Sequence, residues 1–141
     1  MKSGIFKICF AFLTLFAIYS CQPEEENQTP APTDSKSKCI GSWTCQETSG
    51  LNPGNPYTVH IIDSVGTAFV SIENLYSSGF QTKVKASVSG SALTIANQPL
   101  GTGGYTIYGT GNLLSNTSIS LSFSVNDGST IDNVTANLTK Q

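Results

Sequence analysis

An alternation of apolar and polar residues with a period of two runs from Ser42 to the end of the chain. The clearest segment is 117–125, where four apolar residues alternate with four serines. Period two places successive side chains on opposite faces of a β-strand. Turn residues interrupt the pattern at short intervals, and Asn126-Asp127-Gly128 is typical of a tight hairpin. The sequence therefore predicts about eight short strands, with no helical period between them.

Short connections between consecutive strands favour an antiparallel meander, and closing such a meander into a barrel removes its exposed edges. We therefore predict an all-β fold, an eight-stranded antiparallel up-and-down barrel, over residues 39–141. A two-sheet β-sandwich fits the same alternation and is the alternative. The segment is long enough for one domain with one core.

The first twenty residues have the organisation of an export signal. Lys2 and Lys7 precede the apolar run 8–18, which is too short to cross the ~30 Å hydrocarbon core of a bilayer as a helix. The run ends at Ile18-Tyr19-Ser20-Cys21, which resembles a lipobox, the sequence cut before a lipid-modified cysteine. We predict a lipoprotein signal peptide over 1–20 and lipidation of Cys21 with several acyl chains, palmitate among them.

Residues 21–38 contain the lipidated cysteine and then a stretch of prolines and acidic residues with little to bury. Such a composition predicts a disordered linker. Glu24-Glu25-Glu26 resembles the export signal of surface-displayed lipoproteins in some Gram-negative bacteria, and Gln22 differs from the aspartate that retains lipoproteins in the inner membrane. We predict a lipid anchor in the outer membrane at the cell surface; the periplasmic face of that membrane is the alternative.

Several classes of function conflict with the composition. The chain has no arginine, and residues 40–141 contain three lysines, so the basic surface that nucleic acids require is missing. The spacing of Cys39 and Cys45 is not a zinc pattern, and the glycine-rich segments do not open a helix as a nucleotide loop does. His60 and Asp63 point to opposite faces of a strand. We predict a non-enzymatic protein without metal or cofactor.

Cys39 and Cys45 remain after the signal is removed and Cys21 is lipidated. On one straight strand their Cα atoms would lie ~20 Å apart, whereas a disulfide needs roughly 4.4–6.8 Å. A disulfide therefore requires the chain before Ile40 to fold back across the first strand. The sequence is equally compatible with a disulfide and with two buried thiols.

Gly41-Ser42-Trp43, at the start of the first strand, resembles the Gly-x-Trp motif of the calycin superfamily, which contains the lipocalins and avidin-like barrels. The resemblance implies that Trp43 closes the bottom of the barrel beneath a basic residue of the last strand. Lys140 occupies the position expected for that residue, although the family usually has arginine there.

Two kinds of non-catalytic function fit these features. The calycin resemblance implies a barrel that holds a small apolar or amphipathic ligand. Glu47 has the inward parity of Trp43 and is a candidate ligand anchor, although a carboxylate at a strand end is more often solvated. Alternatively, the outer face and the loops 49–56, 75–79 and 97–104 bind a protein or a glycan. Because no set of polar pocket residues is evident, the sequence favours this interaction module.

Overall fold

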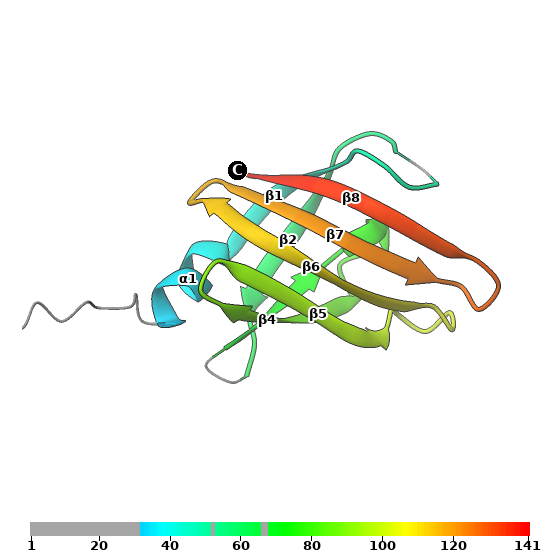
Figure 1. The fold of residues 1–141 in the computed structure, drawn as a ribbon, viewed down its shortest axis with the longest axis horizontal. Helices are drawn as coiled ribbons and strands as arrows, with labels where there is room; N and C mark the ends of the chain where they lie inside the picture. Colours follow the sequence, from blue (N-terminus) through cyan, green and yellow to red (C-terminus); the bar gives the residue numbers. More distant parts are fainter. Residues whose placement is uncertain (1–31, 52, 66–67) are drawn as a thin grey trace, which may run out of the picture.

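The computed structural model describes residues 32–51, 53–65 and 68–141, which form a closed barrel preceded by a short helix (Figure 1). The elements are α1 (Pro32–Cys39), β1 (Gly41–Glu47), β2 (Tyr57–Asp63), β3 (Phe69–Glu73), the 3-10 turn η1 (Leu75–Ser77), β4 (Lys83–Ser89), β5 (Ala92–Pro99), β6 (Thr106–Ser115), β7 (Ser118–Asn126) and β8 (Ile131–Lys140). Each strand pairs antiparallel with the next, and β8 pairs with β1. The up-and-down barrel is confirmed, and the sandwich alternative is wrong.

The strand alternation produces the core. In β7, the apolar residues of the predicted inward face are at most 3% exposed: Ile119, Leu121, Phe123 and Val125. The intervening serines lie on the outer face, where β7 pairs with β6 and β8. Each buried Leu, Ile or Phe contributes roughly 1.5–3 kcal/mol relative to an exposed one. This burial fixes the register, because a shift by one residue would expose the whole row.

The barrel has two different ends. At one end, which we call the mouth, β1, β3, β5 and β7 finish, and η1 connects β3 to β4. At the opposite end, which we call the base, α1 enters the barrel and β8 finishes near the C-terminus (Figure 1). The mouth and helix α1 therefore lie at opposite ends of the barrel.

The structure brings Gly41, Trp43 and Lys140 together at the base. Trp43 is fully buried, and its Nε1 donates a hydrogen bond of 2.8 Å to the carbonyl oxygen of Cys39. The ammonium nitrogen of Lys140 lies 5.1 Å from the centroid of the Trp43 ring and donates to the carbonyl oxygen of Lys38 at 2.9 Å. Gly41 has a φ of 144°, and a Cβ there would lie 2.9 Å from Cε of Lys140. A side chain at position 41 would therefore displace the lysine from the tryptophan.

Replacing Lys140 with Met is expected to lower the free energy of unfolding by about 1–2 kcal/mol. Methionine keeps an apolar stem over Trp43, but it removes the cation–π contact and the charge-assisted hydrogen bond to Lys38. Urea denaturation measures the change, with Lys83→Met as the matched control. Lys83 is 57% exposed and pairs with Glu73 at the surface, so its loss should have little effect. Equal effects of the two substitutions would contradict the role of Lys140.

Helix α1 corrects the prediction that the disordered linker extends to residue 38. Pro32 is at the first helical position, where its missing N–H is not needed, and Lys38 pairs with Asp34 one turn earlier at 2.5 Å. Lys36 pairs with Asp63 at 2.5 Å, at the end of β2, which docks the helix on the base. Among the described residues no helix is long and apolar enough to cross a membrane. The predicted signal peptide and Cys21 lie outside the described residues.

Cys39 and Cys45 are both buried and carry free thiols. Burial raises the pKa of the Cys39 thiol, and it raises the pKa of Cys45 to about 11. A thiolate is the reactive form of cysteine, so burial disfavours the reactive form of both side chains.

Residues 97–99, which the sequence assigns to a loop, belong to β5. The register of β5 against β6 shifts between Ile95 and Gln98, which marks a bulge. Beyond the bulge, the Gln98 side chain accepts a hydrogen bond from the Lys85 N–H at 2.9 Å and donates one to the Lys85 carbonyl at 2.7 Å. The side-chain amide thus replaces a peptide group in the pairing of β4 with β5. The loop at this point is the shorter segment 100–105.

Candidate functional site

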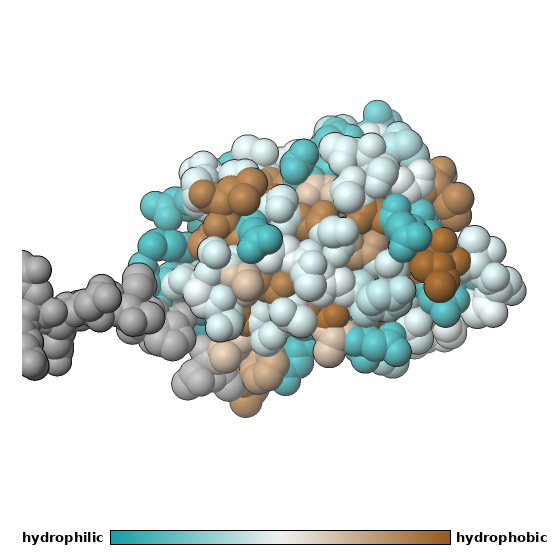
Figure 2. All heavy atoms as spheres, in the orientation of Figure 1, coloured by the Kyte–Doolittle hydropathy of each residue, from teal (hydrophilic) through white to brown (hydrophobic). Residues whose placement is uncertain are grey.

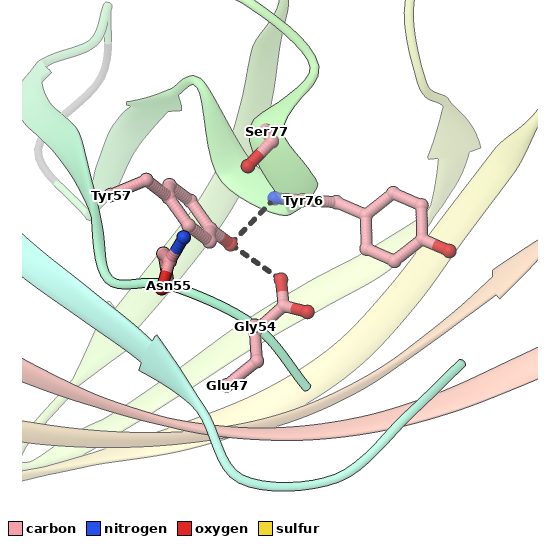
Figure 3. Close-up of a pocket in the computed structure, with 6 residues that line it drawn as sticks. All are labelled: Glu47, Gly54, Asn55, Tyr57, Tyr76 and Ser77. Atoms are coloured by element: carbon pink, nitrogen blue, oxygen red, sulfur yellow. Dashed lines mark hydrogen bonds between the residues drawn. The ribbon is translucent and has the colours of Figure 1, made fainter. Parts of the chain in front are cut away.

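A pocket of about 220 Å³ lies at the mouth of the barrel (Figure 3). Its walls come from the end of β1, the loop 48–56, the start of β2 and η1. The lining residues are Glu47, Gly54, Asn55, Tyr57, Tyr76 and Ser77. Polar atoms and aromatic rings thus meet where the interior of the barrel reaches the surface.

Glu47 and Tyr57 are placed in the pocket by strand parity. Glu47 continues the inward row of Trp43 and Cys45, and it is only 8% exposed, unlike a solvated strand end. Tyr57 is opposite Cys45 in the register of β1 and β2. The Tyr57 hydroxyl donates to Oε1 of Glu47 at 2.6 Å and accepts from the backbone N–H of Tyr76 at 3.0 Å (Figure 3).

The third wall, η1, has an unusual backbone. Asn74, Tyr76 and Ser77 have φ values of 63°, 59° and 50°, a region that is unfavourable for a residue with a side chain. Side-chain hydrogen bonds hold this turn: Asn74 donates to the Thr58 carbonyl at 2.7 Å and accepts from the Gly79 N–H at 2.8 Å. Such local strain is often found at binding sites, where the surrounding structure stabilises it.

Asp132 joins the two segments that cover the mouth. Its Oδ1 accepts from the backbone N–H of Leu51 at 2.9 Å, and its Oδ2 accepts from the Tyr76 hydroxyl at 2.9 Å. The residue is 6% exposed and is the first inward residue of β8, in line with Val134. Asp132 is not among the site residues predicted from the sequence, although its shared parity with Val134 indicates an inward position.

Burial in the site disfavours the charged forms of Glu47, Tyr57 and Tyr76 and so raises their pKa values. Burial raises the pKa of Glu47, the nearby Asp132 carboxylate raises it further, and the hydrogen bond from Tyr57 opposes both effects. Burial is also the main reason that the pKa of Tyr57 is raised. Burial and the hydrogen bond to Asp132 raise the pKa of Tyr76 to about 12. At neutral pH, both tyrosines are hydrogen-bond donors to carboxylates.

Replacing Glu47 with Gln is expected to stabilise the protein near neutral pH by on the order of 1 kcal/mol, as substitutions at functional sites often do. Because the pKa of Glu47 in the folded state lies above its ordinary value of 4.5, folding binds a proton in the interval between the two values. Stability is therefore lost as the pH rises through that interval. Melting temperatures of both proteins from about pH 4 to neutral pH measure the effect.

Glu73→Gln is the control, because Glu73 has a lysine partner at 3.3 Å on the outer surface. Removing the Glu73 charge should not stabilise the protein at any pH. A gap between the melting temperatures of wild type and Glu47→Gln that stays constant with pH would contradict the assignment of the titrating group.

The remaining candidate residues do not form a catalytic set. His60 lies on the outer face, with its ring centroid 4.7 Å from that of Phe80 and its Nδ1 3.6 Å from Glu73. Asp63 pairs instead with Lys36 at the base. Within the described part of the chain, no group of three or more His, Cys, Asp or Glu side chains is placed to hold a metal ion.

A second hollow, of about 390 Å³, lies on the outer surface of β6, β7 and β8. It is lined mostly by uncharged polar residues together with the half-exposed ring of Tyr108. Its lining is Ser49, Tyr108, Gly109, Thr110, Ser122, Phe123, Ser124, Asn133, Val134 and Thr135. Figure 2 shows that residues of intermediate hydropathy dominate this view, with apolar side chains in separate small patches.

No family model matches the chain, and no curated protein matches it. Solved structures, in contrast, have the same architecture. The structure of EF1p2_mFAP2b bound to DFHBI aligns with a TM-score of 0.59 and 13% identity, over 79% of this chain and 100% of that chain. The redesigned β-barrel mFAP1 bound to DFHBI aligns with a TM-score of 0.55 and 16% identity, over 75% and 98%.

A further redesigned β-barrel, b11L5F_LGL, aligns with a TM-score of 0.54 and 17% identity, over 76% of this chain and 95% of that chain. At these identities the likeness establishes the fold alone. It does not establish a function, because one fold serves many functions. Each alignment covers at least 95% of the other chain.

Proposed function

We propose that the protein is a calycin-like lipoprotein, anchored in the outer membrane through Cys21, that binds a small amphipathic ligand at the mouth of its barrel without catalysing a reaction. The observation that carries the proposal is the pocket in which Glu47 and Tyr57 face inward between two covering segments. A small apolar pocket with a few fixed polar groups is the usual form of a small-molecule site. The sequence favoured an interaction module only because no such polar set was evident.

The orientation of the barrel supports this function. The predicted anchor precedes α1 in the sequence, and α1 docks at the base, so the mouth lies at the opposite end of the barrel from this helix. A ligand would then enter from the solvent. Two of the similar solved structures hold the small molecule DFHBI, which agrees with a barrel of this size accommodating a ligand.

The anchor is tested by the mass of the mature protein and its distribution between membrane and soluble fractions. Cleavage before Cys21 with added acyl chains is the expected result, and Cys21→Ala should abolish both the added mass and the membrane association. Recovery of wild type and variant in the same fraction would overturn the anchor. Protease treatment of intact cells distinguishes the outer surface from the periplasmic face.

Native mass spectrometry of the mature chain, purified gently from its host, tests the ligand site. We expect a reproducible additional mass that persists in Tyr108→Ala, on the outer surface, and disappears in Asn55→Trp, which places an indole in the mouth pocket. A chain without additional mass in every preparation, or a mass insensitive to Asn55→Trp, would contradict binding at the mouth.

The outer hollow is the observation that favours a second candidate function, the interaction module. Tyr108 supplies an exposed aromatic face, and the surrounding hydroxyl and amide groups are uncharged, a combination suited to a neutral glycan. An additional mass that is lost in Tyr108→Ala and retained in Asn55→Trp would favour this function over the first.

A further inference from the structure

The two buried carboxylates at the mouth have no cationic partner among the residues that the structure describes. The ion pairs of the barrel and helix join Lys36 to Asp63, Lys38 to Asp34, and Lys83 to Glu73, and the His60 ring also lies 3.6 Å from Glu73. Glu47 and Asp132 are 8% and 6% exposed, and neither takes part in these pairs. A buried charge is strongly unfavourable unless it is paired, so an uncompensated negative charge at an opening indicates that something else can supply the positive one.

The hydrogen bonds of the site show which atom is available. Both oxygens of Asp132 are occupied, one by the Leu51 N–H and the other by the Tyr76 hydroxyl. Oε1 of Glu47 accepts from Tyr57, whose own oxygen accepts from the Tyr76 N–H. Oε2 of Glu47 has no hydrogen-bond partner among the described residues. Of the four carboxylate oxygens, Oε2 of Glu47 is therefore the one left for a ligand, and it lies in a pocket that the side chains of Asn55 and Ser77 also line.

The rest of the pocket selects among cations. A hard metal ion such as Ca²⁺ takes six to eight oxygen ligands. Among the described residues no group of three or more His, Cys, Asp or Glu side chains is placed to hold a metal ion, and Glu47 is the one carboxylate that lines this pocket. An ammonium group, in contrast, needs one or two acceptors, and its apolar body can pack against aromatic rings. Tyr57 lines the same pocket and offers such a ring.

We propose that the mouth binds a protonated amine with an apolar body, whose ammonium group donates a hydrogen bond to Oε2 of Glu47. This inference rests on the proposed ligand-binding function and specifies the chemical class of the ligand. It excludes fatty acids and other carboxylates as ligands of this pocket, because they would place a third negative charge beside Glu47 and Asp132.

The test uses three probes with the same aromatic body: 2-phenylethylamine, 2-phenylethanol and 3-phenylpropionate. They are titrated into the ¹⁵N-labelled mature chain 21–141 carrying Cys21→Ala, which cannot be lipidated and keeps every contact described above. The amide signals of Leu51 and Tyr76 report binding at the mouth. We expect the amine to bind at least about tenfold more tightly than the alcohol, and the carboxylate to bind more weakly than either.

Glu47→Gln should weaken binding of the amine by about tenfold or more while leaving that of the alcohol nearly unchanged. Glu73→Gln, which removes the same charge from the outer surface near the mouth, should leave both unchanged. Equal binding of amine and alcohol, or equal effects of the two variants, would overturn the amine specificity and leave the ligand site in place. If none of the probes shifts the two signals, binding of small ligands at the mouth is itself overturned.

Discussion

Replacing Trp43 with Ala is expected to lower the free energy of unfolding by about 3–5 kcal/mol, a large part of the stability of a domain of this size. The side chain is fully buried, so its removal leaves a cavity at the base. It also leaves the Cys39 carbonyl without its hydrogen bond and the Lys140 ammonium without its ring. Three interactions that connect α1, β1 and β8 are lost together.

Urea denaturation followed by far-ultraviolet circular dichroism measures this effect, because tryptophan fluorescence is lost with the residue. Tyr108→Ala is the matched control: it removes another aromatic ring from a strand, but one that is 41% exposed on the outer face. Its expected cost is less than about 1 kcal/mol. A cost for Trp43→Ala no larger than that of the control would show that the base is not closed by this residue.

Local pattern was sufficient to predict the architecture. The alternation in segments such as 117–125 specifies both the strand and its buried face, and short turns leave few ways to connect such strands. Helix α1 could not be predicted from the sequence, because its residues carry little apolar surface and therefore show no helical pattern. It is held by one turn of charge pairing and by contacts of Lys36 with a strand end that is distant in sequence.

The site was predictable only in part. Parity identified Glu47 as facing inward, and Tyr57 lies on the inward side of the next strand. The backbone of Tyr76 was not predictable, since a tyrosine with a positive φ is maintained by hydrogen bonds to Tyr57 and Asp132 from other strands. A pocket whose lining comes from residues 47–57 and from the distant turn 76–77 requires the closed barrel before its members can be recognised.

Replacing Gly109 with Ala is expected to destabilise the barrel by about 2–3 kcal/mol. Gly109 is opposite Phe123 where β6 and β7 pair, and a Cβ there would lie 2.5 Å from the Ser122 carbonyl oxygen and 2.6 Å from the Phe123 Cα. These neighbours are backbone atoms, so no side-chain rotation can relieve the overlap. The glycine permits β6 to approach β7 closely, as barrel curvature often requires.

Two controls separate this close approach from other effects of a glycine substitution, each measured by urea denaturation. Thr110→Ala changes the adjacent, outward residue of the same strand and should be nearly neutral. Gly128→Ala places a Cβ in open space but at a φ of 92°, so its cost of about 1 kcal/mol reflects backbone conformation alone. If Gly109→Ala lowers the free energy of unfolding no more than Gly128→Ala does, β6 and β7 can move apart without loss of stability. The close approach of the two strands would then not require a glycine at position 109.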